Sequence, residues 1–356
     1  MISDGVITIT DPTPESPPKL GFLGKLFSPL LRDERDVPFI RLSLLLTLIF
    51  GGAAVYMFIP GNFRWWMAPI YWAIYITFVG PFTLMLHNVC HNALFKRKYD
   101  LLNKYIPWMV GVFFGQTPEV YFVHHIGMHH AEGNLPDDLS STMQYQRDSF
   151  IDFTKYAGKF ILLGELELLS YMRRRGRKRL ARRMLIGEIF FITLTVAALL
   201  WNWRAGVVVF VVPALVTRIL LMMGNWAQHA FVDPEDSAND FRTVVTFINS
   251  PYNRRCFNDG YHLGHHLKPN LHWLDMPADF LDRREEMIRQ QSLVFRKIDY
   301  FMIFVLLVLK RHHTLARFLV NLDPDNPLSE EQVVALIKRR VKKLDAGHLA
   351  ALQSAA

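Results

Sequence analysis

Long apolar blocks with almost no charge constrain this chain more than any other feature of its sequence. A helix that crosses the hydrocarbon core of a membrane needs about 20 consecutive, mostly apolar residues. Four stretches are of this kind: 40–60, 66–86, 184–201 and 205–224. The segments that join the first two and the last two are so short that each pair must form a hairpin. The predicted fold class is therefore all-α and integral to the membrane, with four transmembrane helices in two hairpins.

Tryptophan and positive charge predict how these helices lie in the membrane. Both hairpin turns carry paired tryptophans, as is typical of the membrane–water interface: Trp65 and Trp66, and Trp201 and Trp203. Eight basic residues and no acidic one come directly before the third stretch: Arg173, Arg174, Arg175, Arg177, Lys178, Arg179, Arg182 and Arg183. Short loops rich in Lys and Arg stay in the cytosol. We therefore expect a multi-pass protein with both termini on the cytosolic face.

The positive charge also limits the partners that we expect. The chain has 40 Lys and Arg against 32 Asp and Glu, a net charge of +8. Nucleic acid is not an expected partner, because the basic run adjoins a membrane helix. Anionic membrane lipid, or the acidic surface of a redox protein, fits such a run better.

Three regions follow from this pattern. Residues 1–39 are expected to be a cytosolic N-terminal arm, disordered or lying on the surface, because they lack a long apolar stretch and contain Pro12, Pro14, Pro17 and Pro18. Residues 40–310 form the membrane domain, including a cytosolic histidine-rich helical domain, and 311–356 form a cytosolic C-terminal tail. The shorter apolar stretches 106–115 and 298–309 cannot span a membrane and are expected to be re-entrant or interfacial helices.

Histidines carry the chemistry of the sequence. Of 14 in the chain, eleven fall in four places: His87 and His91; His124, His125, His129 and His130; His229; and His262, His265, His266 and His272. Spacings of three and four residues put side chains on one face of a helix, and neutral imidazole is a common metal ligand. Imidazole suits Zn, Cu, Fe and Ni. Nine or more such ligands exceed the four of a tetrahedral zinc site, so two ions of higher coordination number are expected.

The order and spacing of these histidines resemble a known family. HxxxH, HxxxHH and HxxHH are similar to the three histidine boxes of the membrane-bound fatty acid desaturase and hydroxylase superfamily, and Asn225-xxx-His229 is similar to its additional ligand motif. The resemblance covers roughly 82–273. It implies two iron ions held by His87, His91, His125, His129, His130, His229, His262, His265 and His266, with Asn225 acting through water. His124 is an alternate ligand in place of His125. His272 and Asp259 are expected to lie next to the ligands without binding the metal.

The resemblance also implies the reaction. Two irons would use O₂ to oxidise a long fatty acyl chain, and desaturation is the leading expectation. The first two boxes each have three intervening residues, similar to the membrane alkane hydroxylases, whereas stearoyl-CoA-type desaturases have four and two. Hydroxylation of a fatty acid or alkane, and oxidative decarboxylation of a free fatty acid to a terminal 1-alkene, therefore stay open. A metal transporter is the alternative from a different class. Transporters place their ligands near the bilayer midplane, whereas these histidines cluster at the predicted cytosolic ends of the helices.

Electrons for this reaction must come from a separate protein. The sequence has no fused cytochrome b5 motif, no four-cysteine iron–sulfur pattern and no dinucleotide-binding loop. A ferredoxin, a rubredoxin, or cytochrome b5 with its reductase is implied as the electron donor.

Side chains near the boxes are expected to support them. Metal-bound imidazoles usually donate their other N–H to a carboxylate, and the candidates are Asp137, Asp138, Asp233, Asp240 and Asp259. An apolar tunnel for the acyl chain could be lined by Trp108, Phe113, Phe114, Tyr121 and Trp226. If Gly115 faced that tunnel, Gly115→Trp would shorten the accepted chain.

Two charges lie inside the predicted second hairpin. Glu188 and Arg218 stand at equal distances in sequence from its turn, so antiparallel helices would put them at the same depth. Ionisable residues inside a membrane are normally paired or functional. We expect an ion pair between them.

Overall fold

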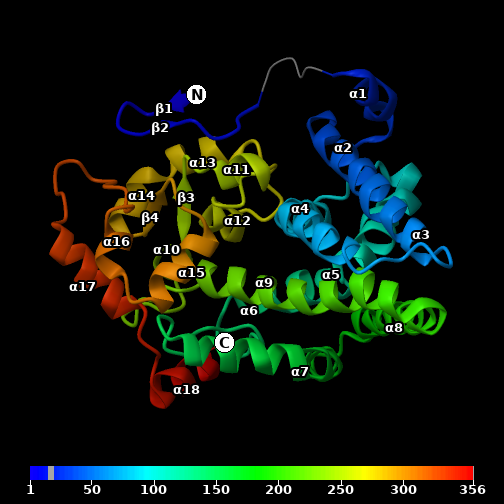
Figure 1. Ribbon diagram of the computed structural model, residues 1–356. Coiled ribbons are helices and arrows are strands. Elements are labelled where there is room, and N and C mark those ends of the chain that lie inside the picture. Colours follow the sequence, from blue (N-terminus) through cyan, green and yellow to red (C-terminus); the bar gives the residue numbers. More distant parts are fainter. Residues whose placement is uncertain (15–19, 356) are drawn as a thin grey trace. The chain divides into compact units, whose positions relative to one another are not determined.

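The computed structural model describes residues 1–14 and 20–355, which are mostly helical (Figure 1). They divide into two compact units. Unit 1 comprises Met1–Thr13, Met128–Leu168 and Ile219–Ala356, and unit 2 comprises Pro14–Gly127 and Leu169–Arg218. The predicted predominance of helix is confirmed. Residues 15–19 of the predicted arm, which include Pro17 and Pro18, lie outside the described residues.

Unit 2 contains the apolar helices. Its elements are α1 (Phe22–Phe27), the short turns η1 (Ser28–Leu30) and η2 (Glu34–Asp36), α2 (Val37–Leu46), η3 (Thr47–Gly51), α3 (Gly52–Phe58), α4 (Met67–His91), η4 (Arg97–Lys104), η5 (Ile106–Val110), η6 (Gly111–Phe114), α5 (Val120–His124) and α8 (Lys178–Gly206), followed by η8 (Val207–Val211). The helix α9 (Val212–Gln228), the π-helical turn η7 (His125–His129) and α7 (Phe150–Arg174) continue from one unit into the other.

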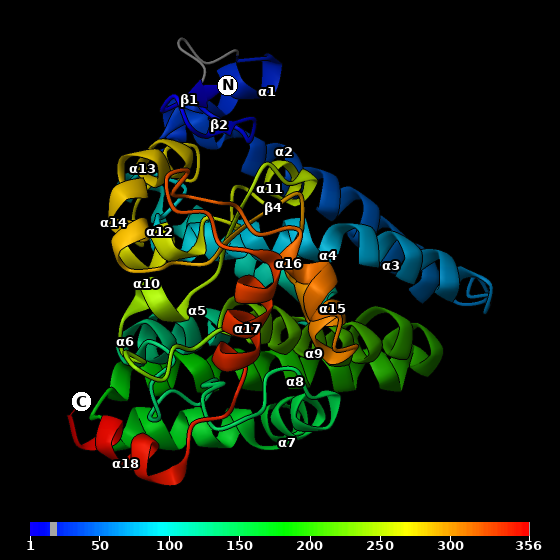
Figure 2. The ribbon, with the colours of Figure 1, turned by 90° about the vertical axis from the view of Figure 1, so that its left-hand side faces the viewer.

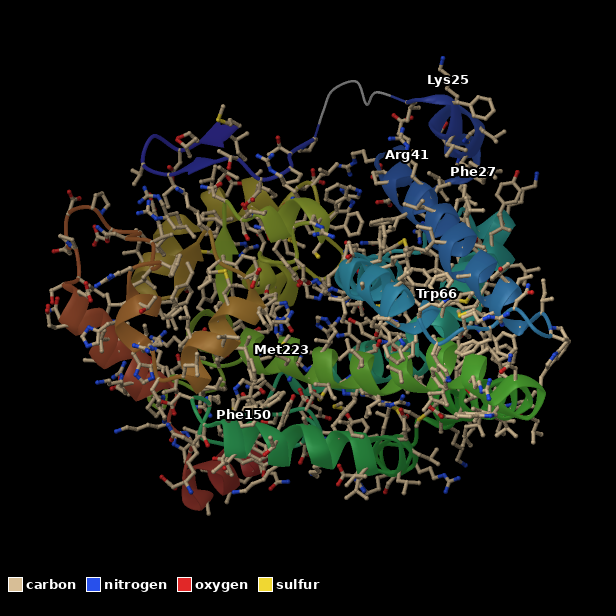
Figure 3. All side chains as sticks on the ribbon, in the orientation of Figure 1. Lys25, Phe27, Arg41, Trp66, Phe150 and Met223 are labelled. Carbon is tan, nitrogen blue, oxygen red and sulfur yellow. The ribbon has the colours of Figure 1, made fainter. Side chains whose placement is uncertain are left out.

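Three helices of the described chain are long and apolar enough to cross a membrane: Glu34–Phe58, Met67–His91 and Lys178–Gln228. In the first, α2, η3 and α3 run on as one helix (Figure 2). Trp66, labelled in Figure 3, comes immediately before the second. Together the three contain the four predicted apolar stretches nearly completely. The number of membrane crossings and their orientation remain predictions.

The third of these helices reverses direction at Asn202. Asn202 has φ −148° and ψ 93°, outside the helical region. A Cβ atom on Gly206 would lie only 3.1 Å from the backbone nitrogen of Leu199, whereas seven residues of straight helix span about 10 Å. The expected third and fourth stretches are therefore the two arms of this interrupted helix. Asn202 also donates to the carbonyl of Met57 at 3.3 Å.

The short apolar stretch 106–115 packs inside unit 2. Its last turns form η5 and η6, in which Val110 and Phe114 are fully buried. The Phe114 ring stacks on Phe82 with centroids 4.2 Å apart. Gly115 has φ +66°, and a Cβ atom there would overlap the backbone of Ala214. The expectation that Gly115 faces a tunnel is therefore wrong, because it faces the backbone of a neighbouring helix.

The predicted ion pair between Glu188 and Arg218 concerns the second hairpin. Arg218 donates to the carbonyl of Ala214 at 3.3 Å, and Glu188 is half-buried in α8. Their ion pair stays a prediction.

Unit 1 is built around a buried aromatic core and two small sheets. Strands β1 (Ile2–Ser3) and β2 (Thr8–Ile9) pair antiparallel, and β3 (Thr246–Ile248) and β4 (Val294–Arg296) pair parallel. Its helices are α6 (His130–Glu132), α10 (Asp240–Thr243), α11 (Pro251–Arg255), α12 (His262–Leu267), α13 (Met276–Asp282), α14 (Arg284–Arg289), α15 (Tyr300–Val308), α16 (His312–Ala316), α17 (Glu330–Arg340) and α18 (Ala346–Ala355). The main core includes Trp226, Phe247, Phe295 and Ile303, each fully buried. The predicted tunnel residue Trp226 is thus a core residue.

Both chain ends are tied into unit 1. Ile9 is fully buried against the cluster around α12 and α13, which anchors residues 1–13. The N-terminal arm over 1–39 stays a prediction. The C-terminal region contributes Val333 and Ile337 of α17 to the main core. Arg147, with no exposed surface, donates to the carbonyls of Ala230 and Arg340 at 3.0 Å. Apolar burial and carbonyl bonding together fix regions that composition alone describes as tails.

Sequence periodicity also left one long helix unrecognised. Helix α7 begins at Phe150, labelled in Figure 3, and continues to Arg174. Its outward face alternates apolar side chains such as Leu162 and Leu166 with the cations Lys155 and Lys159. These charges lower its mean hydropathy, so it does not resemble a transmembrane stretch.

Candidate metal centre

Unit 2 brings three of the predicted ligands together. His87 and His91 lie one turn apart at the end of α4, with ring centroids 5.3 Å apart. His125 begins η7, and its Nε2 lies 2.9 Å from Nε2 of His91. The ligand atoms of all three lie within 4.8 Å of one another. The face predicted from the HxxxH spacing therefore exists, and the second box supplies a third imidazole to it.

Unit 1 brings the other six predicted histidine ligands together. His129, His229 and His266 have ligand atoms within 4.8 Å of one another. His130 and His265 approach to 3.0 Å between their Nε2 atoms. The ring of His262 lies 4.7 Å from that of His266, centroid to centroid. Helix α12 achieves this because residues 262, 265 and 266 follow the one-turn spacing.

A π-helical turn sets the spacing within the second box. In η7, hydrogen bonds run from residue i to i+5, so that His125 and His129 sit on a wider turn than in an α-helix. Such turns recur at functional sites. Immediately afterwards Gly133 adopts φ +57°, which ends α6 in the left-handed conformation.

Several imidazole nitrogens fit a bound metal because they have no other partner. His229 is fully buried, and neither of its ring nitrogens has a hydrogen-bond partner. The Nε2 atom of His266 has none either. Leaving a buried polar group unpaired costs about 1–3 kcal/mol, and one nitrogen of each neutral ring carries a lone pair that needs an acceptor. A metal ion supplies this, and the donor set suits iron as well as zinc or copper.

The charge state of His229 is also suited to metal binding. Burial lowers the pKa of His229 well below its ordinary value, and the neighbouring His266 and His129 lower it further. The imidazole is therefore neutral at physiological pH, which is the form that binds a metal.

Asp138 orients one of these imidazoles. It accepts a hydrogen bond from Nδ1 of His129 at 2.7 Å, and its oxygens also accept from the backbone N–H groups of Asn134 at 3.0 Å and Ser140 at 2.8 Å. This bond makes Nδ1 of His129 the donor, so that Nε2 is the nitrogen that carries the lone pair. Asp138 is thus one of the predicted carboxylates that accept a hydrogen bond from a candidate metal-binding imidazole.

Of the other predicted carboxylates, one lies beside a histidine of the site and three have other partners. Asp240 lies 3.4 Å from Nδ1 of His266, as expected. Asp233 pairs with Arg340 at 2.8 Å and lies outside the histidine groups. Asp137 accepts from Gln353 at 2.7 Å, and Asp259 accepts from the hydroxyl of Tyr252 at 3.1 Å.

Asn225 is held in a fixed orientation one turn before His229. Its amide nitrogen donates to the carbonyl of Ser140 at 2.8 Å and to the hydroxyl of Tyr156 at 2.7 Å. These bonds leave its side-chain oxygen as the group that could reach a metal through water. That role stays a prediction.

Other histidines have different surroundings. His124 is the last residue of α5, and His272 accepts from the backbone nitrogen of Leu274 at 3.2 Å beside the ring of Trp273. His312 lies 3.0 Å from Asp148, His313 lies 3.2 Å from Glu330, and His348 lies 3.0 Å from Ser237. None of these five is in the metal-ligating groups found among the described residues.

Asp11 is a supporting residue that sequence reasoning missed. It is buried and accepts from the hydroxyl of Tyr261 at 2.7 Å and from the backbone N–H groups of Asn249 at 2.6 Å and Ser250 at 3.1 Å. Tyr261 directly precedes His262 and the helix of the third box. No local pattern could reveal this link, since the partners lie far apart in the sequence.

Comparison with protein families identifies the architecture. The family model described as fatty acid desaturase matches residues 63–297, which include every predicted metal ligand. The chain belongs to the fatty acid desaturase family. The resemblance inferred from the histidine boxes is confirmed. No curated protein matches the chain. Membership in this family implies an oxidoreductase of the desaturase and hydroxylase type with a histidine-rich metal site.

Proposed function

We propose that this protein is an integral membrane di-iron enzyme that uses O₂ to desaturate a long fatty acyl chain. The observation that carries the proposal is the set of buried imidazole nitrogens without hydrogen-bond partners, centred on His229, in a member of the fatty acid desaturase family. The proposed ligands are His87, His91, His125, His129, His130, His229, His262, His265 and His266, with Asn225 acting through water.

In this proposal the chain's own residues bind the metal, orient its ligands and shield the site from water. When bound, the iron pair would activate O₂, the oxidant, for removal of hydrogen from an unactivated C–H bond. Asp138 fixes the tautomer and ring orientation of His129. Burial keeps His229 neutral. The dense aromatic core that holds Trp226 and Tyr156 supports the start of the Asn225-xxx-His229 motif and limits access of water.

An external electron donor is part of this proposal. Six cations around the junction of α7 and α8 are exposed: Arg173, Arg174, Arg175, Lys178, Arg179 and Arg182. Complementary charge steers the encounter of redox partners. A ferredoxin, a rubredoxin or cytochrome b5 with an acidic face fits this surface, and the same cations can contact anionic lipid headgroups. We place the site and both termini on the cytosolic face.

Hydroxylation is the second candidate, because the three-residue spacing in both of the first two boxes is similar to that of alkane hydroxylases. Decarboxylation of a free fatty acid to a 1-alkene is the third. All three reactions begin with oxidation of a C–H bond and differ in the product.

Product analysis tests the proposal. Cells that express the protein are supplied with saturated fatty acids of defined chain length, and their lipids and headspace are analysed by gas chromatography with mass spectrometry. Cells that express His229→Ala are the control. An internal alkene absent from the control supports desaturation, whereas an alcohol or a terminal alkene establishes the second or third reaction. Identical profiles from both cell lines, with both proteins present in the membrane, contradict the proposed function.

A further inference from the structure

Glu119 is a buried carboxylate whose role the histidine boxes do not explain. Only 7% of its surface is exposed. It accepts hydrogen bonds from Nζ of Lys104 at 2.6 Å, from Nε1 of Trp108 at 2.7 Å and from the guanidinium of Arg183, whose Nε lies 3.0 Å away. A buried charge is tolerated only when it is paired and hydrogen-bonded. Glu119 meets this condition with donors from η4, η5 and α8.

The charge of Glu119 is stabilised by these donors. Burial raises its pKa, but the hydrogen bonds from Lys104, Trp108 and Arg183 outweigh burial and hold the pKa below its ordinary value. Glu119 therefore remains a carboxylate, and the cluster is a charged clamp across three elements of unit 2.

The backbone of Glu119 sets the start of the helix that leads to the second box. Its φ is +69°, in the left-handed region that residues with a side chain seldom adopt. It is the N-cap of α5, and its carbonyl accepts from the backbone N–H of Val123 at 2.9 Å. Such a conformation persists only where the surroundings over-determine it, and here the side chain is held by three donors.

Helix α8 contacts the same segment at successive turns. The Arg183 guanidinium lies 4.2 Å from the ring centroid of Phe122. One turn further on, a Cβ atom on Gly187 would overlap the carbonyl of Pro118. In the other direction, Arg177 donates to the carbonyl of Gly127. The segment from Pro118 to Gly127 is therefore seated along α8 at both of its ends, and His125 lies between them.

We propose that Glu119 and Arg183 are positioning residues for the second histidine box, which fix the direction of α5 and thereby the place of the His125 ring beside His87 and His91. The inference rests on the proposed function of these histidines as metal ligands. It divides the basic run into two roles, because Arg183 and Arg177 hold the box while the neighbouring Arg182 is exposed. A small rotation of α5 displaces His125, since no flexible residue separates His125 from the helix.

The test compares metal binding in Glu119→Gln, Arg183→Met and Arg183→Lys with wild type, in detergent-solubilised full-length protein. Arg182→Lys is the matched control, one residue away and exposed. Each protein is loaded with Fe(II) and separately with Co(II), whose absorption spectrum reports the geometry of an imidazole site. Release to a chelator is then timed, and thermal unfolding of the metal-free protein is measured in parallel.

We expect Glu119→Gln and Arg183→Met to release metal faster, by up to the roughly 10–100-fold by which loss of a residue that supports a metal ligand lowers metal affinity. We also expect an altered Co(II) spectrum in both variants. Arg183→Lys keeps the charge but loses the two-bonded geometry, so it should fall between Arg183→Met and wild type. Arg182→Lys should match wild type.

Two results overturn different claims. If the three variants keep the wild-type spectrum and release rate while only the melting temperature falls, the clamp is a stability element and the positioning role is wrong. If wild-type protein itself binds neither metal, the proposed function fails instead. Arg183→Lys, the mildest change, keeps the comparison decisive should Glu119→Gln fail to fold.

Discussion

At the scale of single residues, the histidine boxes could be read from the sequence, because a spacing of three or four residues is a local property that any helix converts into proximity. His87 with His91, and His262 with His265 and His266, follow directly from it. Asp138 could be named as a partner because it lies near the second box. That Asp138 and Asp240, among five nearby carboxylates, contact a predicted ligand could not be foreseen, since loop geometry decides whether a side chain turns toward the histidines.

Asp138 gives the first prediction. Asp138→Asn removes the negative charge that accepts from Nδ1 of His129 and from backbone N–H groups at 2.8–3.0 Å. We expect metal affinity to fall by about 10–100-fold, because the imidazole loses its fixed orientation and part of its basicity. Competition with a chelator of known affinity measures the change.

The neighbouring carboxylate is the control for this prediction. Asp137 accepts from Gln353 near the C-terminus, so Asp137→Asn should leave metal affinity within about twofold of wild type. Equal losses in the two variants would mean that general charge near the second box, and not the contact with His129, determines affinity.

At the scale of elements, links between distant segments were beyond sequence reasoning. Asp11 meets Tyr261 across most of the chain, and the clamp at Glu119 draws on residues from three helical elements. A single acidic residue before a short helix, such as Glu119, does not show in the sequence which residues it will contact. The apolar stretches were predictable because membrane helices depend on composition alone, whereas α7 was hidden by its lysines.

Asp11 gives the second prediction. Asp11→Asn removes a buried carboxylate that accepts from the Tyr261 hydroxyl and from the N–H groups of Asn249 and Ser250. Unpaired buried donors cost about 1–3 kcal/mol, so the melting temperature should fall by several degrees. Iron should also be lost faster, because Tyr261 precedes the third box. Differential scanning fluorimetry and chelator release measure the two effects.

Asp4 is the matched control on the same segment. It pairs with Arg284 at 2.6 Å in a more exposed position, and exposed ion pairs are worth about 0–1 kcal/mol. Asp4 also accepts from the backbone N–H groups of Val6 and Ile7 at 2.9 and 2.8 Å. Asp4→Asn should therefore lower the melting temperature less than Asp11→Asn does, and should leave metal release unchanged. If Asp11→Asn behaved like Asp4→Asn, residues 1–13 would be no more than a surface arm.

Gly115 gives the third prediction. Gly115→Ala should destabilise the protein, because the residue has φ +66° and its Cβ atom would overlap the Ala214 backbone. The left-handed conformation alone costs an alanine about 1–2 kcal/mol. Membrane-inserted yield and melting temperature should both fall. Gly158→Ala, at a helical position with open space, should be neutral or stabilising. A stable, active Gly115→Trp enzyme with a shortened chain-length profile would instead restore the tunnel interpretation.

At the scale of the whole molecule, the distribution of charge predicts the orientation in the membrane, which packing does not reveal. The two arms of Lys178–Gln228 meet at a turn that contains Arg204, and the hairpin between the first two apolar helices contains Arg64. Each turn has one basic residue, against the eight that precede the third stretch. Positive loops tend to be retained in the cytosol, so this distribution supports the proposed orientation, in which the histidine-bearing end of α4 faces the cytosol and a soluble electron donor.

This orientation gives the last prediction. In a background with Cys90→Ser and Cys256→Ser, single cysteines are placed at Arg64, Arg204 and Arg179, all exposed positions. A maleimide that cannot cross membranes should label the Arg64→Cys and Arg204→Cys proteins on intact cells, and the Arg179→Cys protein only after permeabilisation. The reason is that, in the proposed orientation, both turns face away from the cytosol and the basic run faces it. The reverse pattern would put the histidine boxes on the far side of the membrane from a cytosolic donor, and the proposed route of electrons would then be wrong. Labelling of Arg64→Cys without Arg204→Cys would show that the helix interrupted at Asn202 does not cross the membrane twice.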